Sequence, residues 1–143
     1  MKRSMIVTII SSLLILLWVY AASSKLIDFE RSKGEMYNQA LPHWMEVILV
    51  WAVPLVEIAT AILLVFIRTR FKGTIISLML LMLFTIYIGL VKLNYFDYVP
   101  CACGGVIRSL TWTEHLFFNL FFLFGASVSF ALQLLRKERE EPK

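Results

Sequence analysis

The chain has 143 residues, of which 59% are hydrophobic and 17% charged, and its mean hydropathy is +0.77. A soluble domain has about 45–50% apolar and about 25% charged residues, so this apolar excess indicates a chain that lies in lipid. Two cysteines are too few for a disulfide-rich scaffold, and the wealth of hydrophobic residues excludes a disordered chain.

Four stretches are apolar enough, and close enough to the roughly 20 residues required, to cross a bilayer. In chain order they are residues 5–22, 45–67, 74–91 and 110–135. Charged or polar segments bound each stretch, and the sequence has no internal repeat. We therefore predict an all-α protein, an integral membrane four-helix bundle, in which residues 1–143 form one domain surrounded by the lipid bilayer.

The distribution of basic residues predicts how the four spans are oriented. Nine Lys and Arg residues lie on the side that holds both termini and the second loop, and five lie on the other side. Because basic residues are retained in the cytoplasm, we expect the N and C termini to be cytoplasmic and the first and third loops to be external. The net charge of +4 is then mainly an orientation signal, and we expect no nucleic-acid partner.

The first span also has the features of a secretory signal peptide, with a basic start, an apolar run and small residues at 21–24. However, its apolar run is 18 residues long and ends in Trp18 and Tyr20, which suit a membrane interface. We therefore favour a retained span, which N-terminal sequencing of the purified protein would test.

Both cysteines fall in the third loop, where Cys101 and Cys103 are separated by one residue. A disulfide between them would close a very small ring, and the strain of such a ring should make the bond easy to reduce. This favours dithiol redox chemistry. Metal binding and an inert pair remain the alternatives.

The two histidines, His43 and His115, are expected at the external ends of the second and fourth spans. His115 follows Cys103 by twelve residues, so its imidazole could lower the pKa of a thiol or transfer a proton. The alternative is that each histidine simply meets water at the membrane interface.

Glu57 lies in the middle of the second span, where an ionised carboxylate costs at least a few kcal/mol unless it is paired, protonated or turned to a polar interior. Asn119 lies one helical turn after His115, so these three residues could form a polar track towards the cysteine loop. The alternative is a packing contact in which Glu57 bonds to Asn119, Lys25 or Lys92.

The fourth span is rich in aromatic residues that could line a pocket for a quinone ring. Phenylalanines on several sides of one helix more commonly face lipid. The residues concerned are Phe117, Phe118, Phe121, Phe122, Phe124 and Phe130.

Several short motifs together resemble one known family. They are Ser24-Lys25-Leu26 after the first span, Val53-Pro54-Leu55-Val56-Glu57 in the second, and Cys101-Ala102-Cys103-Gly104-Gly105 before a fourth span with His115 and Asn119. In this pattern the chain resembles the MauE/DoxX family of redox-associated bacterial membrane proteins, and the resemblance covers nearly all of it.

The resemblance implies a four-helix bundle in the bacterial cytoplasmic (inner) membrane. Methylamine-utilisation members are associated with disulfide formation in a periplasmic enzyme subunit, together with a thioredoxin-like partner, and DoxX-like members with quinone-linked sulfur oxidation. For this chain, the resemblance implies that Cys101 and Cys103 are the redox pair and that Glu57 is the buried acid. A second cysteine pair is absent from the sequence, so an oxidase of the quinone-reducing type would need a partner.

We therefore predict an inner-membrane component of thiol-disulfide oxidoreduction. Its external pair, Cys101 and Cys103, would exchange disulfides with a periplasmic thioredoxin-like protein or client, with His115 and Glu57 as further site residues. One alternative is a protein that binds a soft metal such as Cu(I) through Cys101, Cys103 and His115. Another is a non-catalytic subunit of a larger membrane complex.

Overall fold

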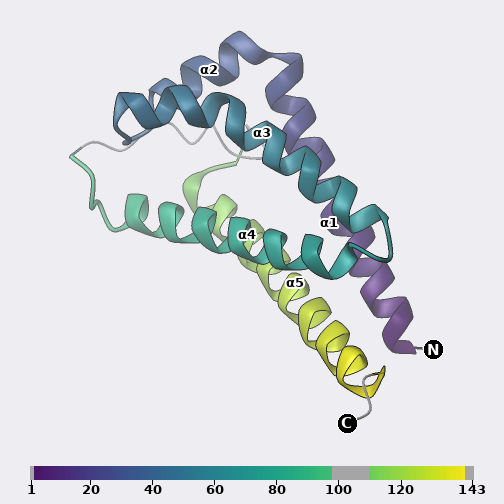
Figure 1. Ribbon diagram of the computed structural model, residues 1–143. Helices are drawn as coiled ribbons and strands as arrows, with labels where there is room; N and C mark the ends of the chain where they lie inside the picture. Colours follow the sequence, from purple (N-terminus) through teal and green to yellow (C-terminus); the bar gives the residue numbers. More distant parts are fainter. Residues whose placement is uncertain (1, 98–109, 141–143) are drawn as a thin grey trace.

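The computed structural model of the chain describes residues 2–97 and 110–140, which contain five helices and no strand (Figure 1). The helices are α1 (Lys2–Ile27), α2 (Phe29–Tyr37), α3 (His43–Val65), α4 (Arg70–Lys92) and α5 (Trp112–Glu140). All except α2 are long and apolar enough to cross a membrane, which confirms the predicted all-α membrane bundle. Each long helix runs through one expected span, with ends displaced by one to five residues.

The four long helices pack in a ring. Helix α1 packs against α3 and α5, and α4 packs against the same two helices, so α3 and α5 are diagonal to one another. Both termini lie at one end of the bundle, as four crossings require, and we call this the termini end (Figure 1). That this end is cytoplasmic stays a prediction from the distribution of basic residues.

The buried core is centred on α1, whose residues Leu14, Leu17, Trp18 and Ala21 repeat at three- and four-residue intervals. This spacing places them on one face of a helix, because an α-helix has 3.6 residues per turn. The other spanning helices complete the cluster with Ala61, Leu64, Leu81 and Ala126. Large apolar side chains also cover the outside of the bundle, as a surface in contact with lipid requires.

Helices α3 and α4 form a tight hairpin. The Thr69 hydroxyl donates to the Leu63 carbonyl at 2.8 Å, and Arg70 Nε donates to the Leu64 carbonyl at 3.3 Å, so both side chains satisfy carbonyls in the last turn of α3. A Cβ on Gly73 would lie 2.9 Å from Leu64 Cγ and 3.0 Å from Leu64 N. Glycine at this position therefore allows the two backbones to approach closely.

Polar side chains also join the helices within the apolar core. The indole of Trp18 on α1 donates to the Ser77 hydroxyl on α4 at 2.9 Å. The amide of Gln133 on α5 donates to the Thr74 hydroxyl on α4 at 2.9 Å and to Ser129 at 3.1 Å. Such bonds stabilise helix association where the surrounding lipid offers no hydrogen-bond partner.

The short helix α2 lies along the first half of α3 (Figure 1). Its Phe29 ring lies 4.5 Å from the ring of Trp51, tilted by 37°, and its Tyr37 ring lies 5.4 Å from the imidazole of His43. The short, polar sequence of this segment predicts no helix. The spacing of Phe29, Met36 and Tyr37 on one helical face is the signal that could have revealed it.

Candidate functional site

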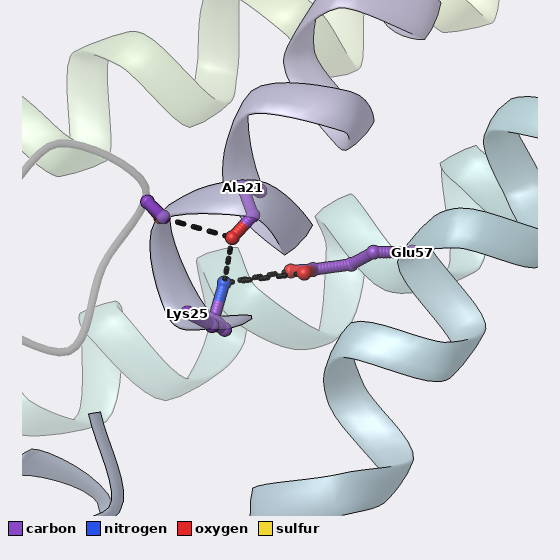
Figure 2. Close-up of polar contacts among 4 residues, drawn as sticks. Ala21, Lys25 and Glu57 are labelled. Carbon is purple, nitrogen blue, oxygen red and sulfur yellow. Dashed lines mark hydrogen bonds and ion pairs between the residues drawn. The ribbon is translucent and has the colours of Figure 1, made fainter. Parts of the chain in front are cut away.

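The most buried charged side chain in the described part of the chain, that of Glu57, forms an ion pair between α1 and α3. Lys25 Nζ lies 2.9 Å from Glu57 Oε1 and 3.3 Å from Oε2, so one ammonium bridges both carboxylate oxygens (Figure 2). The Glu57 side chain is 1% exposed and that of Lys25 is 14% exposed. The carboxylate is therefore neutralised inside the bundle by a basic group from a different helix.

The local sequence explains why these two side chains meet. Lys25 lies one turn after Ala21, on the face of α1 that faces the core, and Glu57 lies one turn after Pro54, which is buried in α3. Helix α1 continues beyond its apolar stretch to Ile27, which carries Lys25 to the level of Glu57.

The carbonyl of Ala21 completes the environment of the ammonium. It accepts a hydrogen bond from Lys25 Nζ at 3.2 Å (Figure 2). It also accepts one from the Ser24 hydroxyl at 2.9 Å. With the two carboxylate oxygens, Lys25 thus has three acceptors for its three N–H groups. The pair is a closed unit of balanced charge, the form in which a membrane interior tolerates ionisable residues.

This contact is one of the alternatives that the sequence left open for Glu57. Among the described residues, Glu57 accepts hydrogen bonds from Lys25 and none joins it to Asn119. Lys92, the other basic candidate, donates instead to the Thr113 hydroxyl. Glu57 therefore ties α1 to α3 and is not joined directly to α5, which lies across the bundle.

His115 and Asn119 are both buried on one face of α5, with 3% and 4% of their surface exposed. His115 lies in the first turn of the helix, where its backbone N–H donates to the Thr111 carbonyl at 2.9 Å. The spacing of the two residues had placed them on a common face, and the structure turns that face towards the interior.

Cys101 and Cys103 lie outside the described residues, so the structure reports only on the helix ends that flank them. Lys92 Nζ at the end of α4 donates to Thr113 Oγ1 at the start of α5 at 2.6 Å. The rings of Tyr87 on α4 and Trp112, the first residue of α5, also lie 6.3 Å apart. The stretch between α4 and α5, which carries both cysteines, therefore starts and finishes at neighbouring points of the bundle.

Sequence reasoning missed two polar contacts close to the start of α3. Glu46 is 5% exposed and lies 3.2 Å from His43 Nδ1, one turn away. The Tyr87 hydroxyl donates to Gln39 at 2.9 Å, which links α4 to the chain between α2 and α3. The three-residue spacing of His43 and Glu46 could have revealed the first contact, whereas no sequence signal indicates the second.

A comparison with models of protein families shows to which family the chain belongs. The family model described as "Methylamine utilisation protein MauE" matches residues 3–132. The chain belongs to the MauE family. Its four apolar helices make it a multi-pass membrane protein, and its family associates it with methylamine utilisation. Comparisons with curated proteins and with solved structures gave no match. The resemblance to DoxX proteins stays a prediction.

The phenylalanines of α5 do not surround one cavity in this MauE-family chain. Phe117, Phe121 and Phe124 are 65–72% exposed and face outward, whereas Phe118 and Phe122 pack against the core. This is the arrangement expected of residues in contact with lipid. A quinone site therefore stays a prediction without support from this helix.

A groove of about 280 Å³ lies between α1 and α3 of the MauE-family chain. Its lining contains one hydroxyl group and no titratable side chain, so it has none of the polar groups that orient a redox cofactor. The residues that line it are Ile15, Val19, Ala22, Ser23, Leu26, Ile58, Ala61, Ile62 and Val65.

Within residues 2–97 and 110–140, no group of three or more His, Cys, Asp or Glu side chains is placed to hold a metal ion. The copper alternative requires Cys101 and Cys103 in addition to His115, and these cysteines are outside that part of the chain. It stays a prediction for the MauE-family protein.

Proposed function

We propose that this MauE-family protein is the membrane component of a thiol–disulfide exchange system, with Cys101 and Cys103 as its reacting groups. The observation that carries the proposal is that both cysteines of the chain lie one residue apart, in a single stretch between α4 and α5. The bond from Lys92 to Thr113 holds the two ends of that stretch together, which supports presenting both thiols at one place.

The exchange needs no group beyond the two cysteines and a partner. The thiolate of one cysteine attacks the disulfide of a thioredoxin-like protein or client, whose S–S bond breaks as a mixed disulfide forms and one partner thiolate leaves. The thiolate of the second cysteine then attacks the mixed disulfide. This releases the partner as a dithiol and leaves a Cys101–Cys103 disulfide. Two electrons pass to the partner, and the reverse sequence oxidises a partner dithiol.

His115 supports this chemistry from the start of α5. Its burial in the first turn of that helix keeps an imidazole near the point where the cysteine stretch rejoins the bundle. A histidine in that position favours thiolate formation and accepts the proton released. Glu57 contributes through its ion pair with Lys25, which holds α1 against α3 as a positioning contact.

The location follows from the same proposal. We place the protein in the bacterial inner membrane with the cysteine pair on the periplasmic side, because the basic residues favour cytoplasmic termini and disulfides form in the periplasm. A soluble thioredoxin-like protein or client can then reach the pair from that side.

The test replaces both thiols in cells that otherwise depend on the protein. We expect the double variant Cys101→Ser/Cys103→Ser to shift the free-thiol content of a set of periplasmic proteins in the same direction and as strongly as loss of the whole chain does. The content rises if the protein oxidises its partner and falls if it reduces it. Differential alkylation with mass spectrometry measures this content. The control Ser109→Ala alters the same stretch without removing a thiol and should behave as the wild type. A double variant that matches the wild type would contradict the proposal.

A further inference from the structure

The charge of the protein is divided very unevenly between the two ends of the bundle. By sequence, the termini end holds nine basic and three acidic residues, a net charge of +6. The remainder holds five basic and seven acidic residues, a net charge of −2, and the two parts give the overall +4. The positive charge of the protein is therefore concentrated at the end that holds its termini and the connection between α3 and α4.

That connection is itself strongly basic. Arg68, Arg70 and Lys72 fall within five residues, and the nearest acids in the sequence are Glu57 and Asp97. Arg68 and Lys72 are exposed, and in the described part of the chain neither forms an ion pair. These cations also lie at or near the start of α4, where the helix dipole does not favour positive charge. Helix stability therefore does not explain their placement.

Arg70 differs from its neighbours because its side chain is held in place. It is half-buried, and its Nε donates to the Leu64 carbonyl at 3.3 Å. This bond uses one of the five N–H donors of the guanidinium, and the two terminal nitrogens of Arg70 can still donate to an anion. An arginine oriented in this way suits a phosphate group, whose oxygens match the planar array of N–H donors.

The α5 side of this end adds a further basic residue. The rings of Phe71 and Phe130 stack at 5.6 Å, and Gln133 bonds to Thr74. Because α4 and α5 run antiparallel there, the residues one turn before Thr74 and one turn after Gln133 lie at the same level. That register places Lys137 at the level of Arg70.

Apolar side chains next to the cations decide which anion fits. Phe66 and Ile67, directly before Arg68, are 61% and 77% exposed. Exposed apolar groups beside a cationic cluster at the end of a membrane span match a phospholipid, whose acyl chains are apolar and whose headgroup carries phosphate. A soluble phosphate compound could contact the cations but would make no use of these two apolar side chains.

From these observations we propose that the connection between α3 and α4 is a binding site for an anionic phospholipid. Arg70, Arg68 and Lys72 contact the phosphate, and Phe66 and Ile67 contact the upper part of the acyl chains. The site is independent of the thiol chemistry proposed above, because it lies at the other end of the bundle from the cysteine stretch.

The test measures lipid binding to the full-length protein by native mass spectrometry, titrating phosphatidylglycerol or phosphatidylcholine into detergent. We expect phosphatidylglycerol to bind more tightly and its affinity to fall as salt is raised. The variant Arg68→Gln/Lys72→Gln should lose about 30-fold in phosphatidylglycerol affinity, since each basic residue near an anionic headgroup contributes about 1 kcal/mol. Phosphatidylcholine binding should not change.

The matched control is Arg31→Gln/Lys33→Gln, which removes the same charge from α2 and should alter phosphatidylglycerol affinity less than 2-fold. Equal losses in the two double variants would show a general charge effect and overturn the site. Equal binding of the two lipids to the wild type would also overturn it, and this measurement needs no variant. Soluble glycerol phosphate that binds as tightly as phosphatidylglycerol would refute the contribution of Phe66 and Ile67.

Discussion

Replacing Glu57 by leucine would leave the ammonium of Lys25 among apolar side chains without its counter-ion. At 2.9 Å and an effective dielectric constant of about 20, the direct attraction between the two charges is about 6 kcal/mol. Desolvation of both groups offsets much of this attraction. Removal of one partner is nevertheless expensive, because the other charge remains buried, and we expect Glu57→Leu or Lys25→Met to lower the free energy of unfolding by about 3–5 kcal/mol.

The double variant Lys25→Met/Glu57→Leu separates this cause from a loss of packing. It removes both charges and keeps side chains of similar volume, so we expect a stability within about 1 kcal/mol of the wild type, or above it. The free energy of unfolding is measured by titrating a denaturing detergent into mixed micelles and following helicity. Arg31→Met, which breaks an exposed pair on α2, is the control and should cost less than about 1 kcal/mol.

Two results would refute this reasoning. If each single variant cost less than about 1 kcal/mol, the pair would not be desolvated as its burial implies. If the double variant were as unstable as the singles, then the loss would come from packing and not from an uncompensated charge.

Three further predictions concern other contacts. Gly73→Ala should lower the free energy of unfolding by about 1–3 kcal/mol. The control Gly89→Ala, where a Cβ meets nothing within 4 Å, should leave that free energy equal or higher. Equal thermal midpoints for the two variants would contradict the close approach of α3 and α4 at Gly73. Ser77→Ala should cost about 1–3 kcal/mol in detergent unfolding because it leaves the buried Trp18 indole without an acceptor, and adding Trp18→Phe should recover part of that loss. His115→Gln should slow thiol alkylation of the folded protein at neutral pH several-fold, and an unchanged rate would remove His115 from the proposed chemistry.

The sequence was sufficient to predict the four spans because the bilayer imposes one simple requirement, a long apolar helix. It was not sufficient to place the helix ends. Helix α1 continues through Ser23, Ser24 and Lys25 to Ile27, although these three residues are polar. Polar side chains do not end a helix, because its hydrogen bonds are formed by the backbone. The short helix α2 was missed for a related reason, because its helical face rests on α3 and not in lipid.

The partner of Glu57 illustrates a different limit. Lys25, Lys92 and Asn119 were all compatible with one buried carboxylate, because a one-dimensional pattern does not reveal which helices are neighbours. Packing decides the matter by placing α3 beside α1 and across from α5. The candidate site residues stand out in the sequence as rare polar groups in an apolar chain, but the contacts between them depend on helix order within the bundle.

Thiol trapping in cells tests the central claim most directly. Cells that produce the full-length protein are quenched in acid, and free thiols are labelled with a maleimide that adds mass, so that oxidised and reduced forms separate on a gel. The proposal predicts that Cys101 and Cys103 are recovered in both forms, and that Cys101→Ser or Cys103→Ser traps a mixed disulfide with a partner. Two cysteines that are always recovered as free thiols, with no mixed disulfide in either single variant, would contradict a role in disulfide exchange.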